Sequence, residues 1–343
     1  MQTDKKRIRI KIPVLAPVIL VILLSFSILG AFWLQRHNDI DKVQMKIEGA
    51  SLFYDEYIRT HSSLMSAMLD LIKGNSDLKN AWLAKDRDKL LELAKPIFEN
   101  LHSKCKVTHM YFHSPDRTCF LRVHNPAKYG DFITRPTMDL AEEHQQPASG
   151  VEFGPYGTYT LRVVHPWLID GELSGYVEIG EEVEEILPVL KNVFGVELFI
   201  TIDKYYLNRA DWEEGMRMMG RKNANWDMFS KIVIVNSTLE NLSEESLKGI
   251  GGILEGHKKS SHEKSLFDVV IKRRSYKGGF VHLVDAGHLY VGDIIVMKDI
   301  TQVKSSLKLF SIILTFVCII VGAALWTLFC AYIRRIESGA SST

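Results

Sequence analysis

The feature that most limits the fold of this chain is an apolar run near each end. The first run covers residues 12–34, and the second covers residues 309–333. Each is long enough to cross a lipid bilayer as an α-helix, which takes about 20 apolar residues. The roughly 270 residues between the runs suffice for one or two folded domains. We therefore predict a two-pass membrane protein with a large polar segment on one side of the membrane.

The first run could also belong to a cleaved signal peptide, because a cluster of basic residues precedes it. These residues are Lys5, Lys6, Arg7, Arg9 and Lys11. The apolar core of a signal peptide has about 7–15 residues and ends at a small-residue cleavage site. This run is longer and continues through Phe32, Trp33 and Leu34. We therefore expect an uncleaved transmembrane helix.

The flanking charges predict how the chain is oriented. Basic residues precede the first run, and Arg334 and Arg335 follow the second, so residues 1–11 and 334–343 are expected in the cytoplasm. Residues 36–308 are then outside, in the periplasm if the membrane is a bacterial inner membrane. A transporter would normally need more than two helices, and neither run contains a charged residue that would mark an ion path.

Overall composition gives no sign of a nucleic-acid partner. The net charge is +1, and the hydrophobic fraction of 46% includes both apolar runs, so the middle segment has ordinary globular composition. The basic runs Lys258-Lys259 and Lys272-Arg273-Arg274 are short and lack interleaved aromatic residues. We expect both to be solvated surface.

The cysteines are expected to be free thiols. Two of the four lie in the second apolar run, which leaves Cys105 and Cys119 in the polar segment. Residues 107–113 and 118–124 have the pattern of a β-hairpin that places Cys119 opposite Phe112. Cys119 is then about seven residues, roughly 23 Å, from Cys105 along the strand. Disulfide partners lie within about 7 Å, and the spacing fits neither a metal site nor a c-type haem.

A long helix is predicted after the first apolar run. Apolar, aromatic or small residues recur there at alternating spacings of three and four, and His61 fills the one missing position. The other positions are Ile40, Val43, Ile47, Ala50, Tyr54, Tyr57, Leu64, Met68 and Leu71. This seam would pair with a second subunit in a homodimer or pack on the segment's own sheet, and the pattern fits both. Gly74-Asn75-Ser76 ends the helix, and a second helical stretch, residues 78–101, is punctuated by Pro96.

After residue 107 the hydrophobic period changes to two, which is typical of strands. The elements that follow the first hairpin are a helix at 137–145, strands at 156–167 and 173–180, and an exit helix at 181–194. The two strands turn at Asp170-Gly171, a strong hairpin signal. Two hairpins around a loop-and-helix insertion predict a PAS-like antiparallel sheet in a distal module of about residues 105–194.

A second, similar set of elements predicts a proximal module of about residues 195–298. Its expected strands lie at 196–202, 231–236, 266–272, 279–284 and 289–296, and its helices at 205–217 and 243–255. The link to the second apolar run, residues 298–308, is short and helical in pattern, so a shift in this module would be passed directly to the membrane. The predicted class is α+β, with a long N-terminal helix and two antiparallel-sheet modules between two transmembrane helices.

Five short runs carry a resemblance to a known family. They are Tyr111–Arg117, Phe120–Pro126, Gly150–Gly154, Leu161–Val164 and Gly175–Gly180. These runs resemble the double Cache family of extracytoplasmic sensors on bacterial chemoreceptors, diguanylate cyclases and sensor kinases. The resemblance implies two PAS-like modules after a long helix, a small-molecule pocket in the distal module, and dimeric signalling.

Receptors of this family normally continue into a HAMP linker and an output domain, whereas this chain stops soon after Arg335. We therefore expect either a truncated receptor or one that works with a separate cytoplasmic signalling protein. No nucleophile elbow, phosphate loop or zinc-hydrolase helix occurs, so we expect neither enzymatic activity nor a cofactor.

The first hairpin is expected to have one apolar face and one face of aromatic and cationic residues. The second face holds His109, Tyr111, His113, Phe120, Arg122 and His124. Such a face suits a small anionic or zwitterionic ligand. The histidines could converge there, but they lack a compact ligand motif with an acidic third member, so no metal is expected.

Arg122 and Arg162 are the sharpest candidates for ligand contact. A guanidinium in an otherwise apolar strand is costly unless it is paired, and its planar fork can hold a carboxylate through two hydrogen bonds. The alternative is an internal salt bridge to Glu178 or Glu152. A simple two-residue turn would place Arg162 opposite Ile179, although a bulge at a nearby proline would change that register.

Loop and aromatic residues complete the predicted site. Arg135 could close over a ligand or be merely solvated, and aromatic side chains, Tyr159 and Trp167 included, could line a pocket or pack in the core. The predicted ligand-binding residues are Arg122, Arg162, Tyr111, His124, Arg135, Phe120, Tyr176 and Glu178. The chain is thus expected to be a membrane receptor for a small carboxylate or amino acid. The alternative is an anchored subunit that binds no ligand and pairs with another membrane protein through the long helix.

Overall fold

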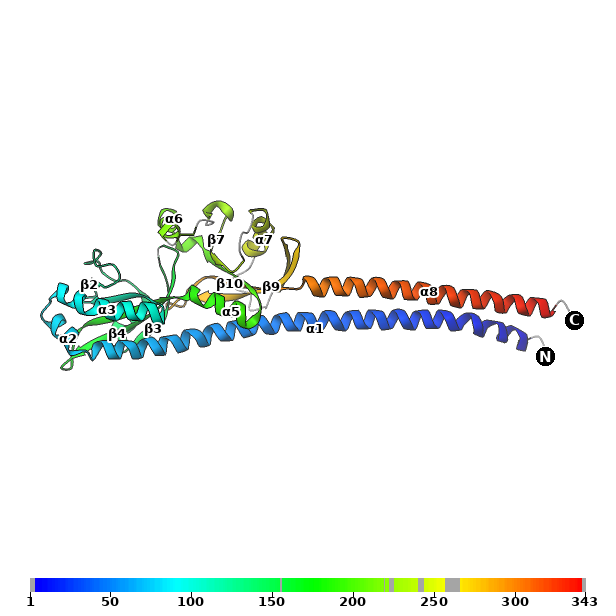
Figure 1. Cartoon of the computed structure of the whole chain (residues 1–343), viewed down its shortest axis with the longest axis horizontal. Coiled ribbons are helices and arrows are strands. Elements are labelled where there is room, and N and C mark those ends of the chain that lie inside the picture. Colours follow the sequence, from blue (N-terminus) through cyan, green and yellow to red (C-terminus); the bar gives the residue numbers. More distant parts are fainter. Residues whose placement is uncertain are drawn as a thin grey trace. The chain divides into compact units, whose positions relative to one another are not determined.

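The structure of the chain is a computed structural model that describes residues 4–154, 156–218, 220–221, 225–239, 244–256 and 266–340. The chain divides into two compact units (Figure 1). One unit comprises Met1–Gln44 and Asp299–Thr343, and the other comprises Met45–Lys298. Among the described residues the first unit is essentially helical, and the strands lie in the second, the final one ending at Asp299.

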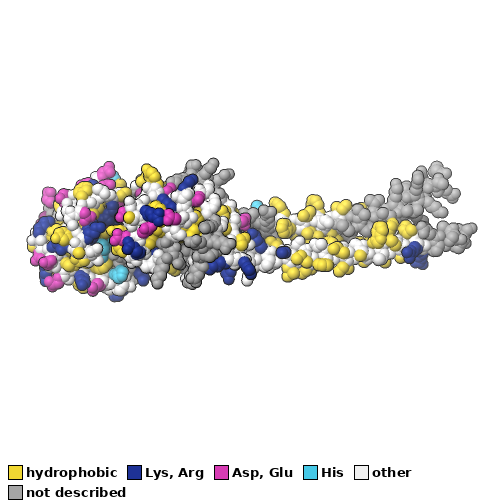
Figure 2. Space-filling model, turned by 90° about the horizontal axis from the view of Figure 1, so that it is seen from above, with side chains coloured by type: hydrophobic (Ala, Val, Ile, Leu, Met, Phe, Trp, Pro, Cys, Tyr) yellow, Lys and Arg dark blue, Asp and Glu magenta, His cyan; other side chains and the backbone are white. Residues whose placement is uncertain are grey.

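The two predicted apolar runs lie within long helices. The first run is part of α1 (Asp4–Lys73), and the second is part of α8 (Thr301–Ala340). Thr301–Arg335 is long and apolar enough to cross a bilayer, and Ile22–Leu34 is a shorter apolar stretch among the described residues. Hydrophobic side chains are exposed along both helices, as Figure 2 shows. Exposed apolar surface on this scale indicates a lipid or protein environment.

The breaks between the next helices follow from capping residues. Asn75 caps α2 (Ser76–Leu83) by accepting hydrogen bonds from two backbone N–H groups at 3.0 Å, which confirms the predicted end of the long helix. The predicted interruption at Pro96 is wrong, because α3 (Arg87–Cys105) continues through it. The chain instead breaks at Lys85, whose φ is 55°, and Asp86 then caps α3.

The first sheet has five antiparallel strands in the order β2-β1-β5-β4-β3. They are β1 (Val107–His113), β2 (Cys119–Arg122), β3 (Ala148–Phe153), β4 (Tyr159–Ile169) and β5 (Glu172–Glu182). The helix α4 (Pro136–His144) precedes β3, close to its predicted bounds. The strand β3 was not predicted, because Ser149 and Gly150 blur its alternation of apolar and polar residues.

The turn between β4 and β5 sets the register of the candidate site. Asp170 and Gly171 have φ values of 54° and 93°, as a two-residue hairpin turn with positive φ at both positions requires. A register shift at Trp167 and Leu168 moves Arg162 opposite Gly180. Arg162 therefore does not have the pairing with Ile179 that a simple turn would give, because the expected bulge is present.

The second sheet repeats the strand order of the first. Its strands are β6 (Glu197–Asp203), β7 (Ile232–Ser237), β8 (Phe267–Ile271), β9 (Arg274–Val284) and β10 (Tyr290–Asp299), in the order β7-β6-β10-β9-β8. The remaining helices are α5 (Ile186–Phe194), α6 (Arg209–Met218) and α7 (Glu244–Gly256). α5 begins later than predicted because β5 extends to Glu182. The α+β class with two antiparallel sheets is confirmed.

The long helix packs on the Met45–Lys298 unit along the predicted seam at Ala50 and Tyr54, which are buried, but departs from that seam nearer its C-terminal end. Met65 and Leu69 are buried there, whereas the predicted Leu64 and Leu71 are 52% and 79% exposed. An α-helix drifts relative to a strict seven-residue repeat, so the buried stripe moves by one position over several turns. His61 does contact the sheet, with Nδ1 2.8 Å from a carboxylate oxygen of Glu181.

Two minor expectations concern charge and thiols. The run Lys272-Arg273-Arg274 is exposed at the turn between β8 and β9, as predicted, whereas Lys258-Lys259 lies outside the described residues. All four cysteines are free. Cys119 pairs with His113 rather than with Phe112, because a bulge interrupts the β1–β2 register.

Candidate functional site

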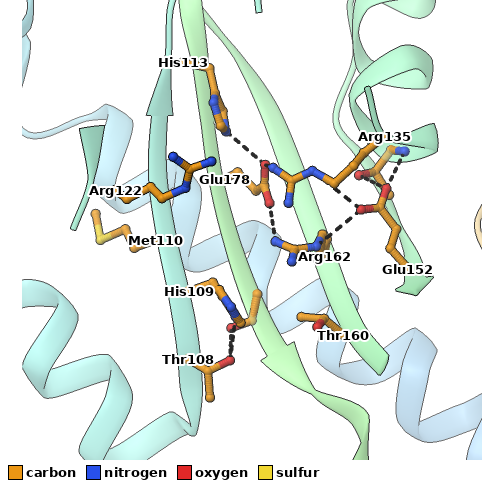
Figure 3. A network of polar contacts seen from close by, with 12 residues as sticks. Thr108, His109, Met110, His113, Arg122, Arg135, Glu152, Thr160, Arg162 and Glu178 are labelled. Carbon is orange, nitrogen blue, oxygen red and sulfur yellow. Dashed lines mark hydrogen bonds and ion pairs between the residues drawn. The ribbon is translucent and has the colours of Figure 1, made fainter. Parts of the chain in front are cut away.

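A network of buried charged side chains lies on one face of the first sheet, where β1, β3, β4 and β5 meet the start of α4 (Figure 3). Glu178, on β5, is its centre. Its Oε2 accepts hydrogen bonds from His113 Nε2 at 2.9 Å and from Arg135 Nη2 at 2.8 Å, and its Oε1 accepts one from Arg162 Nη1 at 2.6 Å. Burial opposes ionisation of this carboxyl group, but the two arginines and His113 hold its pKa well below its usual range.

A second carboxylate, Glu152 on β3, closes the network. Its Oε1 accepts hydrogen bonds from the backbone N–H and the hydroxyl of Thr137, at 2.8 and 2.6 Å. Thr137 is in the first turn of α4, where backbone N–H groups lack helical partners, so the helix start itself holds the acid. The other oxygen, Oε2, lies 3.3 Å from Arg162 Nε and accepts no hydrogen bond from the described residues. Burial raises the pKa of Glu152, while both arginines oppose that rise.

Three guanidinium groups surround one aromatic ring. The Cζ atoms of Arg135, Arg122 and Arg162 lie 5.1, 5.4 and 5.7 Å from the centre of the Tyr111 ring. A cation over an aromatic face is attracted by the ring quadrupole. Tyr111 is itself buried, with 6% of its surface exposed. The ring therefore acts as a common platform for the three cations.

Arg122 is engaged by the loop that follows β2. Its Nη1 and Nη2 donate to the two carboxylate oxygens of Asp131 at 2.6 and 2.5 Å, and Nη1 also donates to the carbonyl of Lys128 at 2.7 Å. The hydrogen bond from Arg122 lowers the pKa of Asp131. This bidentate pair anchors the loop in front of α4.

Access to the network differs among its members. The side chain of Arg135 is 20% exposed, that of Arg162 is 9% exposed and that of Glu178 is fully buried. Arg135 is also the residue that joins the two carboxylates from the solvent side, with its Nε 3.8 Å from Glu152 Oε2. A solute that reaches the network would therefore meet Arg135 first.

The histidines next to the network are neutral at physiological pH. Burial lowers the pKa of His109 well below its usual range and that of His124 to about 4. The two rings meet edge to face with their centres 4.7 Å apart. Within the described part of the chain, no group of histidine, cysteine and acidic side chains has an arrangement suited to a metal ion.

The comparisons with known proteins agree with the repeated fold. Residues 43–210 match a family described as the double sensory domain of two-component sensor kinases. The chain carries a double Cache sensory domain. It is thus an extracytoplasmic sensory domain of a signalling receptor, and no catalytic family was detected.

Solved sensory and ligand-binding domains of bacterial receptors are similar at low identity. The periplasmic domain of Vibrio cholerae LuxQ is 13% identical, with 76% of this chain and 99% of that chain covered and a TM-score of 0.40. The sensory domain of the Campylobacter jejuni chemoreceptor Tlp3, solved with isoleucine bound, is 10% identical, with 78% and 95% covered and a TM-score of 0.41. The ligand-binding domain of Pseudomonas aeruginosa PctB, solved with L-Arg, is 11% identical, with 76% and 94% covered and a TM-score of 0.40. A comparison with curated protein sequences found no match. The assignment rests on the family match.

The double Cache domain brings most of the predicted ligand-binding residues together. Six of them lie on the network face: Arg122, Arg162, Tyr111, His124, Arg135 and Glu178. Tyr176 is buried in the apolar cluster beside that face, with Tyr111 and Cys119.

The predicted position of Phe120 beside Tyr111 is wrong. Its ring packs edge-on against Trp82, 5.2 Å away between centres, in the apolar core of the other face. The cause is the β-bulge between Phe112 and His113, because one extra residue in a strand exchanges the two faces beyond it. Cys119 takes the place on the network face that Phe120 was expected to occupy.

Four partners in the network were not predicted as site residues: His113, Asp131, Thr137 and Glu152, the last of which was expected only as an alternative salt-bridge partner. Asp131 lies in the loop rich in Pro, Gly and Asp, and only the folded loop brings it back to Arg122. Thr137 carried a usable signal, because the preceding Pro136 marks the first position of a helix. An acid on a neighbouring strand could then have been expected at that helix start.

Proposed function

We propose that this double Cache domain senses a small amino acid outside the cytoplasm and that α1 and α8 anchor it in a bacterial inner membrane. Basic residues before the first apolar run, and Arg334 and Arg335 after the second, support cytoplasmic ends by the positive-inside tendency. The segment between the two apolar runs, about residues 36–308, would then be periplasmic. Its output would pass through α8 to a separate cytoplasmic signalling protein or to a domain that this sequence does not contain.

The charge balance of the network favours a zwitterion over a simple carboxylate. Arg122, Arg135 and Arg162 are already matched by Asp131, Glu152 and Glu178. A free carboxylate would have to displace an internal one, and that would leave a buried charge without a partner. A zwitterion carries both charges, so its ammonium group can pair with an acid of the site while its carboxylate pairs with an arginine. The total charge of the site is then unchanged.

The observation that carries the proposal is the open acceptor on Glu152. Its Oε2 is buried and accepts no hydrogen bond from the described residues, and the partly exposed Arg135 lies beside it. A buried carboxylate oxygen without a donor is unfavourable. The ammonium group of an amino acid would satisfy this oxygen while its carboxylate binds Arg135, with Arg162, Glu178 and Tyr111 around it.

Replacing Arg135 by alanine is expected to weaken amino-acid binding by about 10- to 100-fold, because a hydrogen bond between charged groups is worth about 1.5–3 kcal/mol. Thermal-shift titration of the full chain in detergent measures this, since bound ligand stabilises by RT ln(1 + [L]/Kd), about 2.7 kcal/mol at a hundredfold excess. Each amino acid is paired with the acid that lacks its amino group, for example alanine with propionate and aspartate with succinate. Only the amino acid of the productive pair should stabilise the protein.

Arg117→Ala serves as the matched control, because Arg117 pairs with Asp139 and Glu142 away from the network. This variant should keep the wild-type affinity. Equal stabilisation by an amino acid and its deaminated analogue would contradict the zwitterion assignment. No saturable shift with any amino acid, in a folded protein, would favour the second candidate function.

That second candidate is an anchored interaction subunit that binds no ligand. It is favoured by one observation, which is that Arg122, the sharpest candidate from the sequence, already has a bidentate partner in Asp131. A network that is complete within the chain can serve stability alone. The thermal-shift pairs above separate this function from that of a sensor.

The proposed sensor acts as a homodimer through α1. Apolar side chains on the sensory part of this helix are exposed at two seven-residue spacings, Met45 with Leu52 and Leu64 with Leu71. Their exposed fractions range from 52% to 79%, which is unfavourable for a helix in water. Light scattering on the full chain in detergent, corrected for bound detergent, should give twice the chain mass. The mass of a single chain would contradict the dimer.

A further inference from the structure

The turn that joins β9 to β10, residues 285–289, is built as a rigid tip. The side chain of Asp285 accepts hydrogen bonds from the backbone N–H groups of Gly287 and Leu289, at 2.9 and 2.7 Å. The backbone N–H of Asp285 in turn donates to the carbonyl of Leu289 at 2.9 Å. These bonds fix the shape of the turn without help from the rest of the second sheet.

This tip lies against the first sheet at its edge strand β3. The backbone N–H of Ala286 donates to the carbonyl of Val151 at 2.7 Å. One residue before the tip, the carbonyl of Val284 accepts a hydrogen bond from the Tyr159 hydroxyl at 2.9 Å. The tip therefore uses the free edge of β3 as a strand would, through its backbone.

The contact depends on a glycine. A Cβ atom added at Gly150 would lie 2.6 Å from Cβ of Ala286, closer than side-chain carbon atoms approach, and a tight 3.3 Å from its Cα. On the other side, a Cβ added at Gly287 would lie 3.4 Å from the ring of Pro136. The tip thus fits between β3 and the first residue of α4.

The residues that the tip touches are the sequence neighbours of the charged network. Val151 precedes Glu152 on β3, and Pro136 lies between Arg135 and Thr137. Thr137 and Glu152 are joined by two hydrogen bonds, and Arg135 faces the same acid. If a change in the Arg135–Glu152 pair moves β3 or the start of α4, the surface that the tip contacts moves with them.

We propose that the turn at residues 285–289 shifts when the Arg135–Glu152 pair forms or breaks, and that β10 transmits this shift to the second sheet. The proposal rests on the proposed function in that the pair is taken as part of the ligand site. β10 runs from this turn to Asp299, and the chain enters α8 at Thr301. Gly150 and Ala286 are positioning residues, because they touch each other and not the ligand.

Hydrogen exchange of the full chain in detergent, followed by mass spectrometry without any ligand, tests this coupling. Arg135→Gln is expected to speed exchange of the amides of residues 284–290 about tenfold. Without the ion pair to Glu152, β3 is held less firmly, so the turn that rests on it opens more often. Gly150→Ala should produce a similar increase by separating the tip from β3. Arg135→Gln added to Gly150→Ala should then change exchange in this segment little further.

Ala286→Gly in the Gly150→Ala background is the matched rescue, because it removes the closest carbon atom. Recovered protection shows that Gly150→Ala acts through the contact and not by unfolding β3. The proposal is overturned if Arg135→Gln leaves exchange at residues 284–290 unchanged while Gly150→Ala raises it, or if Gly150→Ala itself has no effect. Since no ligand is present, failure of amino-acid binding would leave this result intact, and failure here would leave the binding assignment intact.

Discussion

Glu178→Ala is expected to lower the free energy of unfolding by about 3–5 kcal/mol, the usual cost of removing one partner from a buried ion pair. Glu178 is fully buried and accepts hydrogen bonds from His113, Arg135 and Arg162. Without it, the only acid that remains beside the buried guanidinium of Arg162 among the described residues is Glu152, at 3.3 Å. Urea unfolding of the full chain in detergent, followed by tryptophan fluorescence, measures the change.

Glu143→Ala is the control for this variant, because Glu143 is an exposed glutamate on α4 and a substitution there should stay within about 0.5 kcal/mol. The double variant Glu178→Ala with Arg162→Ala should lose less free energy of unfolding than the two single variants lose together, because the effects of contacting residues are not additive. A loss below about 1 kcal/mol for Glu178→Ala would show that the network does not hold the sheet together.

Glu182→Gln is expected to stabilise the protein at pH 8 by up to about 3 kcal/mol and to have little effect at pH 5. Burial and the nearby Glu184 raise the pKa of Glu182 to about 7. The unfolded chain releases this proton near the ordinary value of 4.5, whereas the folded chain keeps it up to about pH 7. Folding stability is therefore lost as the pH rises between these values, and an uncharged glutamine removes that loss.

The size of this effect follows from the difference between the two pKa values of Glu182, 4.5 in the unfolded chain and about 7 in the folded protein. Each unit of this difference corresponds to about 1.4 kcal/mol of stability, and the product is an upper limit. The groups that face Glu182 are Thr160, His109 and, through their charges, Glu184, Arg162 and Arg221. Glu185→Gln is the control, because Glu185 is exposed three residues away. Parallel stability curves for Glu182→Gln and wild type from pH 5 to pH 8 would contradict the assignment.

Much of the fold could be predicted because its signals are local. Alternating apolar residues marked β1, β4 and β5, and Asp170-Gly171 marked the turn between the last two. The missed strand β3 contains Ser149 and Gly150, and only a glycine at position 150 leaves room for Ala286. The residue types in β3 therefore depend on a contact that is distant in sequence, which no local pattern reveals.

The site was less accessible from the sequence, because the partner of each charge depends on loops and bulges. Arg122 and Arg162 were both singled out from the sequence as arginines in otherwise apolar strands, but the acid that binds Arg122 comes from a loop that folds back over nine residues. The bulge at His113 exchanged Cys119 and Phe120 between faces. A bulge alters register by one residue and carries little sequence signature, so alternation alone could not assign those two side chains.

The shared strand order of the two sheets makes their positions comparable residue by residue. Tyr111, the fifth residue of β1, pairs with Glu178, and Thr201, the fifth residue of β6, pairs with Asp293. Each half of the doubled fold therefore carries an acid at the same point of its central strand. In the second half this acid is bound by His282 and Tyr290, whereas in the first half it is bound by two arginines and His113. Two copies of one scaffold thus hold an acid at equivalent positions with different partners, so the duplicated strand order does not fix the chemistry around its central strand.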